Sequence, residues 1–240
     1  MGHRGGEAVE RIREQVVRLV VPAQLLFVVG FVAAALAQPA SYSWLDDDIS
    51  DLGALTARHA WLELAPSLLA GVVTIAFALL VLRPLVAGPG PLLLALSLMG
   101  LDNVSDPFFR LDCGRALPGC TESVRRGSWH AEVHVVVGFV SAVATVAAFV
   151  ALGRAFRRLP GWDDLAAPSY VFAGVVLAVL LAYAGLAEKS GGGLVQRLSV
   201  LLLVAALSLL AARTRAAHDV PTRVPLAFVA TEADDPGQHD

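Results

Sequence analysis

Long apolar runs separated by short polar connections are the main pattern of this chain. A helix needs roughly 20 apolar residues to cross a membrane. Six apolar stretches approach that length, at residues 16–37, 62–82, 91–103, 130–152, 168–187 and 194–212. The third is short, and it extends to residue 109 only if its polar residues face protein or water. The pattern predicts an all-α polytopic membrane protein, a bundle of six transmembrane helices.

The composition supports this fold class and excludes one kind of partner. Hydrophobic residues make up 56% and charged residues 16% of the chain, against about 45–50% and about 25% in soluble domains. Lipid must therefore solvate part of the apolar surface. The net charge of −3 argues against nucleic acid, which requires a basic patch. Membrane lipid is the expected partner, and protein partners stay unknown.

The basic residues indicate an orientation. Most of the 18 Lys and Arg residues precede the first stretch, follow the last, or lie in the second and fourth connections. Because cytoplasmic loops are enriched in Lys and Arg, both termini are predicted to be cytoplasmic. The first, third and fifth connections then lie outside.

The chain divides into a polar cytoplasmic tail (1–15), a transmembrane domain (16–212) and a cytoplasmic tail (213–240). Disorder is expected in the last, which has little apolar periodicity. Ala35-Leu36-Ala37 at the end of the first stretch resembles a signal-peptidase site. The apolar run before it, about 20 residues, exceeds the 7–15 typical of a signal peptide. We therefore predict a retained helix, whereas cleavage would leave five spans.

The first outer connection contains an acidic motif. Its aspartates are Asp46, Asp47, Asp48 and Asp51. One interpretation is a solvated acidic loop. The other is that Asp48 and Asp51 cap or clamp another group, in a turn or short helix that includes Ser50 and stops at Gly53.

The second outer connection holds the only two cysteines, Cys113 and Cys120. The outside of a cell is oxidising, so disulfides persist there. Gly114, Pro118 and Gly119 favour a turn between the two thiols. We predict a disulfide, with metal ligation and free thiols as alternatives.

Candidate chemistry lies where the third and fourth stretches reach the outer side. Asp102 and Asp106 are four apart, as are His130 and His134, so each pair shares a helix face. The histidine stripe continues through Gly138, and small residues mark helix contacts. Two such imidazoles can bind one divalent metal such as zinc, with the carboxylates as further ligands. Structural polar contacts and proton or ion transfer are the alternatives.

Two charged residues flank the third outer connection. Glu188 would complete an outer polar cap or pair with Lys189. Arg197 would reach the membrane interface or meet an acidic partner. The available partners are Asp48, Asp51, Asp102 and Asp106.

These motifs resemble a bacterial membrane family known as domain of unknown function 998. The resemblance covers residues 16–212. It rests on segment 49–53, the Asp106-Pro107 region with its cysteine loop, the histidine opening the fourth stretch, and segment 193–198. It implies six transmembrane helices in a bacterial cell membrane and no assigned activity. A more distant likeness is to membrane hydrolases of the alkaline ceramidase and progestin-receptor type, which hold zinc. A third histidine is missing from the predicted spans here.

Three functions remain open, and whether the protein is an enzyme is left undecided. The leading hypothesis is an outward-facing site acting on a lipid or lipid-linked substrate. His130 and His134 would be metal ligands or base, and Asp102 or Asp106 the partner that orients or activates them. The second is a binding, sensing or assembly protein that docks partners on the disulfide loop. The third is a small transporter, although the span middles lack the ionisable groups that carriers use.

Overall fold

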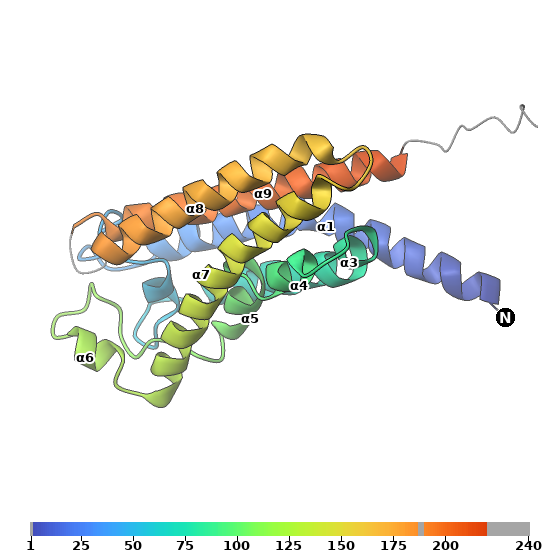
Figure 1. Cartoon of the computed structure of the whole chain (residues 1–240). Coiled ribbons are helices and arrows are strands. Elements are labelled where there is room, and N and C mark those ends of the chain that lie inside the picture. The colour runs from blue at the N-terminus through green and yellow to red at the C-terminus, as the bar shows by residue number, and fades with distance from the viewer. Residues whose placement is uncertain (1, 187–189, 220–240) are drawn as a thin grey trace, which may run out of the picture.

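The computed structural model describes residues 2–186 and 190–219, and within these ranges it contains helices and no strand (Figure 1). The α-helices are α1 (Gly2–Leu36), α2 (Trp61–Ala76), α3 (Arg83–Leu85), α4 (Gly90–Ala95), α5 (Asn103–Ser105), α6 (Glu122–Arg125), α7 (Trp129–Phe156), α8 (Ala166–Leu186) and α9 (Gly192–Asp219). Two 3₁₀ segments, η1 (Ser50–Gly53) and η4 (Asp163–Leu165), and two π-helical segments, η2 (Phe77–Leu82) and η3 (Leu98–Asp102), complete the order.

The all-α polytopic class predicted from the sequence is confirmed, but the count of six spans is not. In the described part of the chain, five helices are long and apolar enough to cross a membrane. They are Gly6–Leu36, Trp61–Leu85, Trp129–Phe156, Asp163–Gly185 and Gly192–Ala217. The third predicted span is instead a shorter apolar element, Gly90–Ser105.

That shorter element still runs along the long axis of the bundle. In Figure 1 the chain leaves α3, passes through α4 and reaches α5 on the way back toward the loops. The start of α1 and the end of α9 consequently lie at the same end of the bundle, which we call the termini end. Segments 37–60 and 106–128 gather at the opposite end, which we call the loop end.

A break explains why the third element is not one regular helix. Ser97 is extended, with φ −73° and ψ 173°, so the backbone after α4 restarts as the π-helical η3. The amide of Leu98, freed by the break, donates to Thr145 Oγ1 of α7 at 3.1 Å. Gly71 of α2 lies against Gly100, where an added Cβ would come within 2.8 Å of the Gly100 carbonyl. These contacts fix η3 between α2 and α7.

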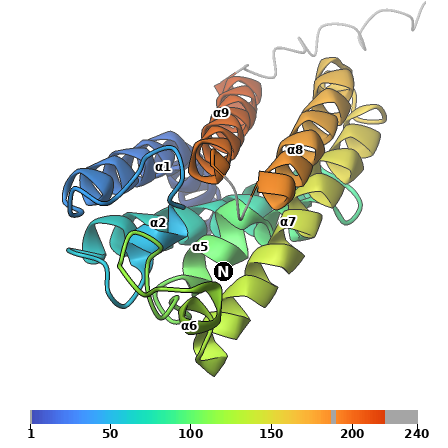
Figure 2. The same ribbon diagram turned by 90° about the vertical axis from the view of Figure 1, so that its left-hand side faces the viewer.

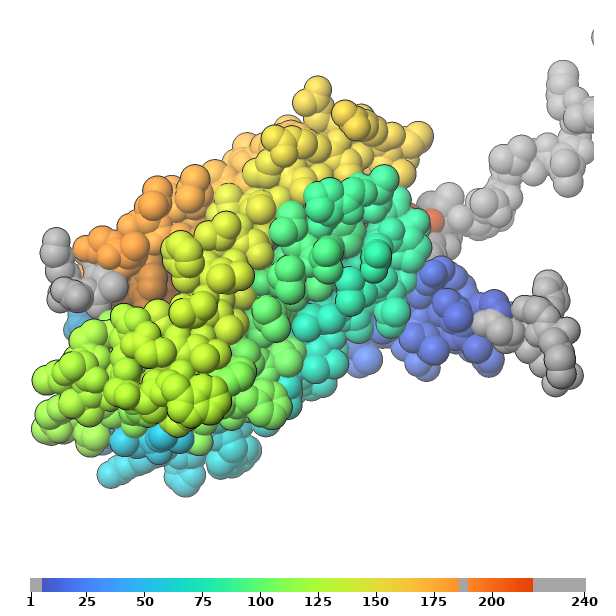
Figure 3. Space-filling view, turned by 60° about the horizontal axis from the view of Figure 1, so that its bottom comes forward, coloured from blue at the N-terminus to red at the C-terminus, as the bar shows by residue number. Residues whose placement is uncertain are grey.

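The helices pack side by side in a closed bundle, in which α8 also contacts α9. Views from two directions show α1 beside α2 and α9, and α7 beside α8 (Figures 1 and 2). Figure 3 shows α7 side chains lying between those of α8 and those of α4. The main core includes Phe27 of α1, Phe77 of η2 and Phe156 of α7.

The terminal segments differ from a simple tail-and-domain division. Helix α1 begins at Gly2, so the described part of the predicted tail 1–15 is helical and continues into the first span. Helix α9 continues to Asp219, past the predicted end of the domain at residue 212. Residues 220–240 of the predicted disordered tail lie outside the described residues.

Candidate ligand-binding site

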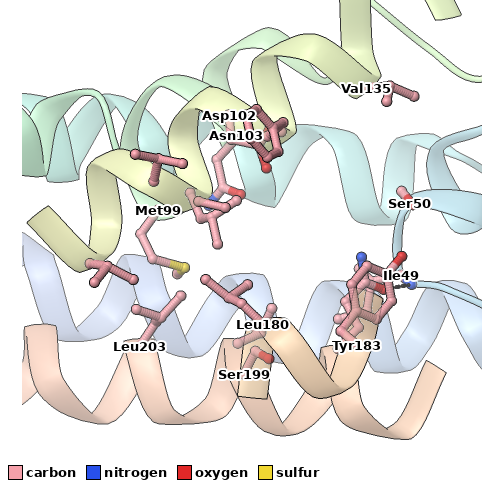
Figure 4. Close-up of a pocket in the computed structure, with 18 of the residues that line it drawn as sticks. Ile49, Ser50, Met99, Asp102, Asn103, Val135, Leu180, Tyr183, Ser199 and Leu203 are labelled. Atoms are coloured by element: carbon pink, nitrogen blue, oxygen red, sulfur yellow. Dashed lines mark hydrogen bonds between the residues drawn. The ribbon is translucent and has the colours of Figure 1, made fainter. Parts of the chain in front are cut away.

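A cavity of about 920 Å³ lies between α7, α8, α9 and η3. Figure 4 shows Asp102 and Asn103 on one side of it, Leu180 and Leu203 facing them, and Ile49, Ser50 and Tyr183 toward the loop end. Most of the wall is apolar, from positions on α7, α8 and α9. Acidic, basic and imidazole side chains line the rest. The cavity therefore joins an apolar channel to a polar patch.

The helix geometry leaves this cavity open on one side. Helices α7 and α8 approach closely near the termini end, where an added Cβ on Gly153 would lie 3.2 Å from Ala166 O. From there they diverge toward the loop end (Figure 1). Phe139, Val143 and Leu181 line the cavity and yet are 71%, 56% and 64% exposed. They form a rim that faces the surface expected to contact lipid.

Three carboxylates and one imidazole form the polar patch, which we call the acid–imidazole cluster: Glu63, Asp102, Asp106 and His134. Asp102 ends η3, and π-helical turns occur frequently at functional sites. Its Oδ1 faces Gly138 of α7, whose added Cβ would lie 3.6 Å away. The glycine leaves room for the carboxylate between the two helices.

His134 is held in one ring orientation by the chain around it. Its Nδ1 lies 3.0 Å from the carbonyl oxygen of Phe109, and a carbonyl can only accept, so this nitrogen carries the proton. Asp106 Oδ1 lies 3.4 Å from the same nitrogen. Asp106 Oδ2 accepts a hydrogen bond from Ser67 Oγ at 3.4 Å. The second ring nitrogen of His134 is therefore the one left for a ligand.

His130 does not join this cluster, although its spacing predicted that it would. Its Nδ1 lies 2.7 Å from Ser128 Oγ, which donates to Asp112 Oδ1 at 2.6 Å. Ser128 also caps α7 by accepting from the Ala131 amide. This places His130 in the first turn of α7, where the capping residue and not the bundle interior provides its partner. Hydrogen bonds from Ser128 lower the pKa of Asp112.

The two imidazoles thus have separate partners and do not share one ligand position. Among residues 2–186 and 190–219, no group of three or more His, Cys, Asp or Glu side chains is arranged to hold a metal ion. A zinc site on His130 and His134 has no geometric support in the described structure.

Glu63 is the cluster member that the sequence reasoning missed. It lies in the first turn of α2 and is only 2% exposed. Gly53 at the end of η1 makes room for it, since an added Cβ there would come within 3.0 Å of Glu63 Oε2. The position of an acidic residue within an apolar span could have indicated a functional role, because burying a charged side chain in a membrane costs free energy and such residues are usually functional.

The acidic motif of segment 46–53 clamps an arginine of segment 106–128. Arg125 Nη2 lies 3.1 Å from Asp48 Oδ2, and Arg125 Nε donates to Asp51 Oδ1 at 3.0 Å. All three side chains are buried. Arg115 adds a longer contact to Asp48, at 3.4 Å. Burial raises the pKa of both aspartates, and the arginines oppose that rise.

The other residues of the motif position this clamp against the cavity. Ser50 opens η1 and lines the cavity. Arg110 donates to the carbonyls of Gly53 and Ala54 at 2.7 and 2.8 Å. The Ile49 amide donates to Gln196 Oε1 of α9 at 2.5 Å. The motif therefore links α2, α9 and segment 106–128.

Arg197 does not meet any of the four aspartates proposed as its partners. Its Nη1 donates to the carbonyls of Trp44, Asp47 and Gly193 at 2.7–2.9 Å, and its Nη2 to the hydroxyl of Tyr42. The guanidinium also lies over the Tyr42 and Trp44 rings. Arg197 thus connects α9 to segment 37–60. Glu188, the other residue of the proposed polar cap, lies outside the described residues.

The predicted disulfide between Cys113 and Cys120 is confirmed, with a Cα–Cα distance of 6.0 Å. It closes the loop that carries Arg115. The free thiol and metal alternatives for these cysteines are therefore wrong.

Apolar helices of membrane-spanning length, grouped around a cavity with buried acidic residues, define a multi-pass membrane protein. Residues 21–213 match the model of a protein family of unknown function, DUF998. The chain belongs to this family, as its short motifs predicted. No curated protein and no solved structure matches the chain.

Proposed function

We propose that this membrane protein binds a lipid or lipid-linked molecule in the cavity between α7, α8 and α9. The hydrocarbon chain lies along the apolar wall, and the polar head lies at the acid–imidazole cluster. The observation that carries the proposal is the continuity of one cavity from Asp102, Asp106 and His134 to the exposed rim on α7 and α8.

The size and lining of the cavity support a ligand of this kind. Ligand sites are usually about 300–1,000 Å³, mostly apolar, with a few polar groups that fix orientation. This cavity has about 920 Å³ and the same division of lining. An opening between two membrane helices lets a lipid enter sideways, so its chain need not cross water.

Catalysis on the bound molecule is a second candidate function, favoured by one contact. Asp106 lies beside His134, and an imidazole oriented by a carboxylate is a common general base. His134→Gln would then abolish turnover of a bound lipid ester without lowering its occupancy. A variant that keeps turnover would limit the site to binding.

Native mass spectrometry of the purified protein tests the binding proposal. Ala142 lines the cavity, whereas Val140 lies on the same helix, is 50% exposed and is absent from the cavity wall. Ala142→Trp fills the cavity and is expected to remove a tightly retained lipid. Val140→Trp adds the same side chain on the outside and is expected to retain it. Equal lipid retention by both variants would refute the proposal.

A further inference from the structure

The acid–imidazole cluster contains more acidic than basic groups. Glu63, Asp102 and Asp106 are three carboxylates, and among the described residues one imidazole, that of His134, lies against Asp106. Charges held away from water are stable only when they are paired, protonated or bound to a cation.

The nearby arginines already have other partners. Arg110 donates to two backbone carbonyls. Arg125 binds Asp48 and Asp51, and Arg115 contacts Asp48 and Glu122. Arg126 pairs with Glu132 at 3.0 Å. Hydrogen bonds to neutral carbonyls leave the charge of Arg110 in place, and that charge acts on Glu63. The other three arginines are paired with acids outside the cluster, so Asp102 and Asp106 are the carboxylates open to a cationic ligand.

Buried polar atoms without partners point into the same place. Asp102 Oδ1 is a buried acceptor with no hydrogen bond, and Asp106 Oδ1 has only the 3.4 Å contact with His134 Nδ1. Asn103 is 5% exposed, lines the cavity, and its Nδ2 has no acceptor. Most buried polar groups in native proteins are satisfied, so these atoms are positions where the polar head of a ligand can bind. Carboxylate acceptors beside one free amide donor fit a positively charged N–H group next to an oxygen.

We infer that the ligand of this cavity is an amphiphile with a cationic amine at the head of its hydrocarbon chain. This inference rests on the proposed function. The amine donates to Asp102 and Asp106, and an adjacent ligand oxygen accepts from Asn103. The apolar wall on α7, α8 and α9 takes the chain.

The test compares three probes of equal chain length: dodecylammonium, dodecanol and dodecyl phosphate. Each is titrated into the full-length protein in an uncharged maltoside detergent, and occupancy is read by native mass spectrometry. Dodecylammonium is expected to bind at least about tenfold more tightly than the other two, since a buried charged hydrogen bond contributes that much or more.

Variants then show which carboxylates cause the preference for dodecylammonium. Asp102→Asn with Asp106→Asn is expected to reduce the preference to about twofold or less. Glu132→Gln removes an acid of α7 that is exposed and lies outside the cavity wall, and it is expected to leave the preference intact. Melting temperatures of the variants show whether each remains folded, and single Asn variants replace the double variant if it does not.

The outcomes separate this inference from the proposed function. If all three probes bind equally and Ala142→Trp excludes each of them, the inferred preference for a cationic amine is refuted, whereas the proposed lipid site is supported. A preference that survives the double Asn variant also refutes the inference. Failure of every probe to bind, with Ala142→Trp indistinguishable from wild type, refutes the proposed function itself.

Discussion

Replacement of Arg125 by methionine tests how the acidic motif stabilises the protein. Arg125 is 6% exposed, and its partners Asp48 and Asp51 are 0% and 4% exposed. Methionine matches the unbranched stem of arginine and cannot donate. Arg125→Met therefore leaves two buried carboxylates without their main counter-charge.

The magnitude follows from burial. Breaking a buried ion pair by removing one partner costs about 3–5 kcal/mol. Arg115, 3.4 Å from Asp48, still compensates one of the carboxylates, so we expect a loss near the lower limit, about 3 kcal/mol. In a chain of this length that corresponds to a fall in melting temperature of roughly 6–12 °C.

Thermal unfolding in detergent, followed by circular dichroism, measures the effect. The matched control is Arg126→Met at the next position, where the arginine is half-buried and its partner Glu132 is 52% exposed. Such a pair contributes less than about 1 kcal/mol. Adding Asp48→Asn and Asp51→Asn to Arg125→Met should recover part of the loss, because no unpaired charge remains. The reasoning is refuted if Arg125→Met lowers the melting temperature no more than Arg126→Met does.

Three further predictions concern the loop end. Gly193→Ala is expected to lower stability by about 1–3 kcal/mol, measured by thermal unfolding, because an added Cβ would collide with the Asp47 carbonyl; an unchanged melting temperature would contradict this packing. Cys113→Ser, or reduction of the wild type, should remove about 2–3 kcal/mol, while two thiols that react with an alkylating reagent before reduction would contradict the disulfide. Ser128 lowers the folded-state pKa of Asp112, so the stabilisation is complete above the unfolded pKa of about 4 and is lost as pH falls through the lower, folded value. Melting temperatures of wild type and Asp112→Asn should therefore differ most above about pH 4 and converge in stronger acid, whereas a gap that widens in acid would contradict the assigned hydrogen bonds.

The helices were predictable because their signal is local. Apolar runs of membrane length marked five helices that the structure contains. The third stretch is shorter and is not one regular helix, since its backbone break at Ser97 is stabilised by Thr145 of α7. A hydrogen bond between residues far apart in sequence leaves no trace in a hydropathy pattern.

The site was predictable only in part, for the same reason. Asp102 and Asp106 come from one turn, and His134 could be placed opposite them by its helix face. His130 shares that face by spacing, yet Ser128 binds it at the start of α7. Glu63 reaches the cluster through tertiary packing against Gly53. The clamp of Arg125 by Asp48 and Asp51 likewise joins segments 37–60 and 106–128, which only the fold brings together.

Photo-crosslinking tests the central claim most directly. A lipid with a diazirine on its acyl chain is reconstituted with the protein, irradiated, and the adducts are mapped by peptide mass spectrometry. The account predicts adducts concentrated at cavity-lining Ala142, Val146 and Leu180, and their loss in Ala142→Trp. Adducts at these positions no more frequent than at outward-facing Val136 and Val140, and unchanged in the variant, would contradict a lipid site in this cavity.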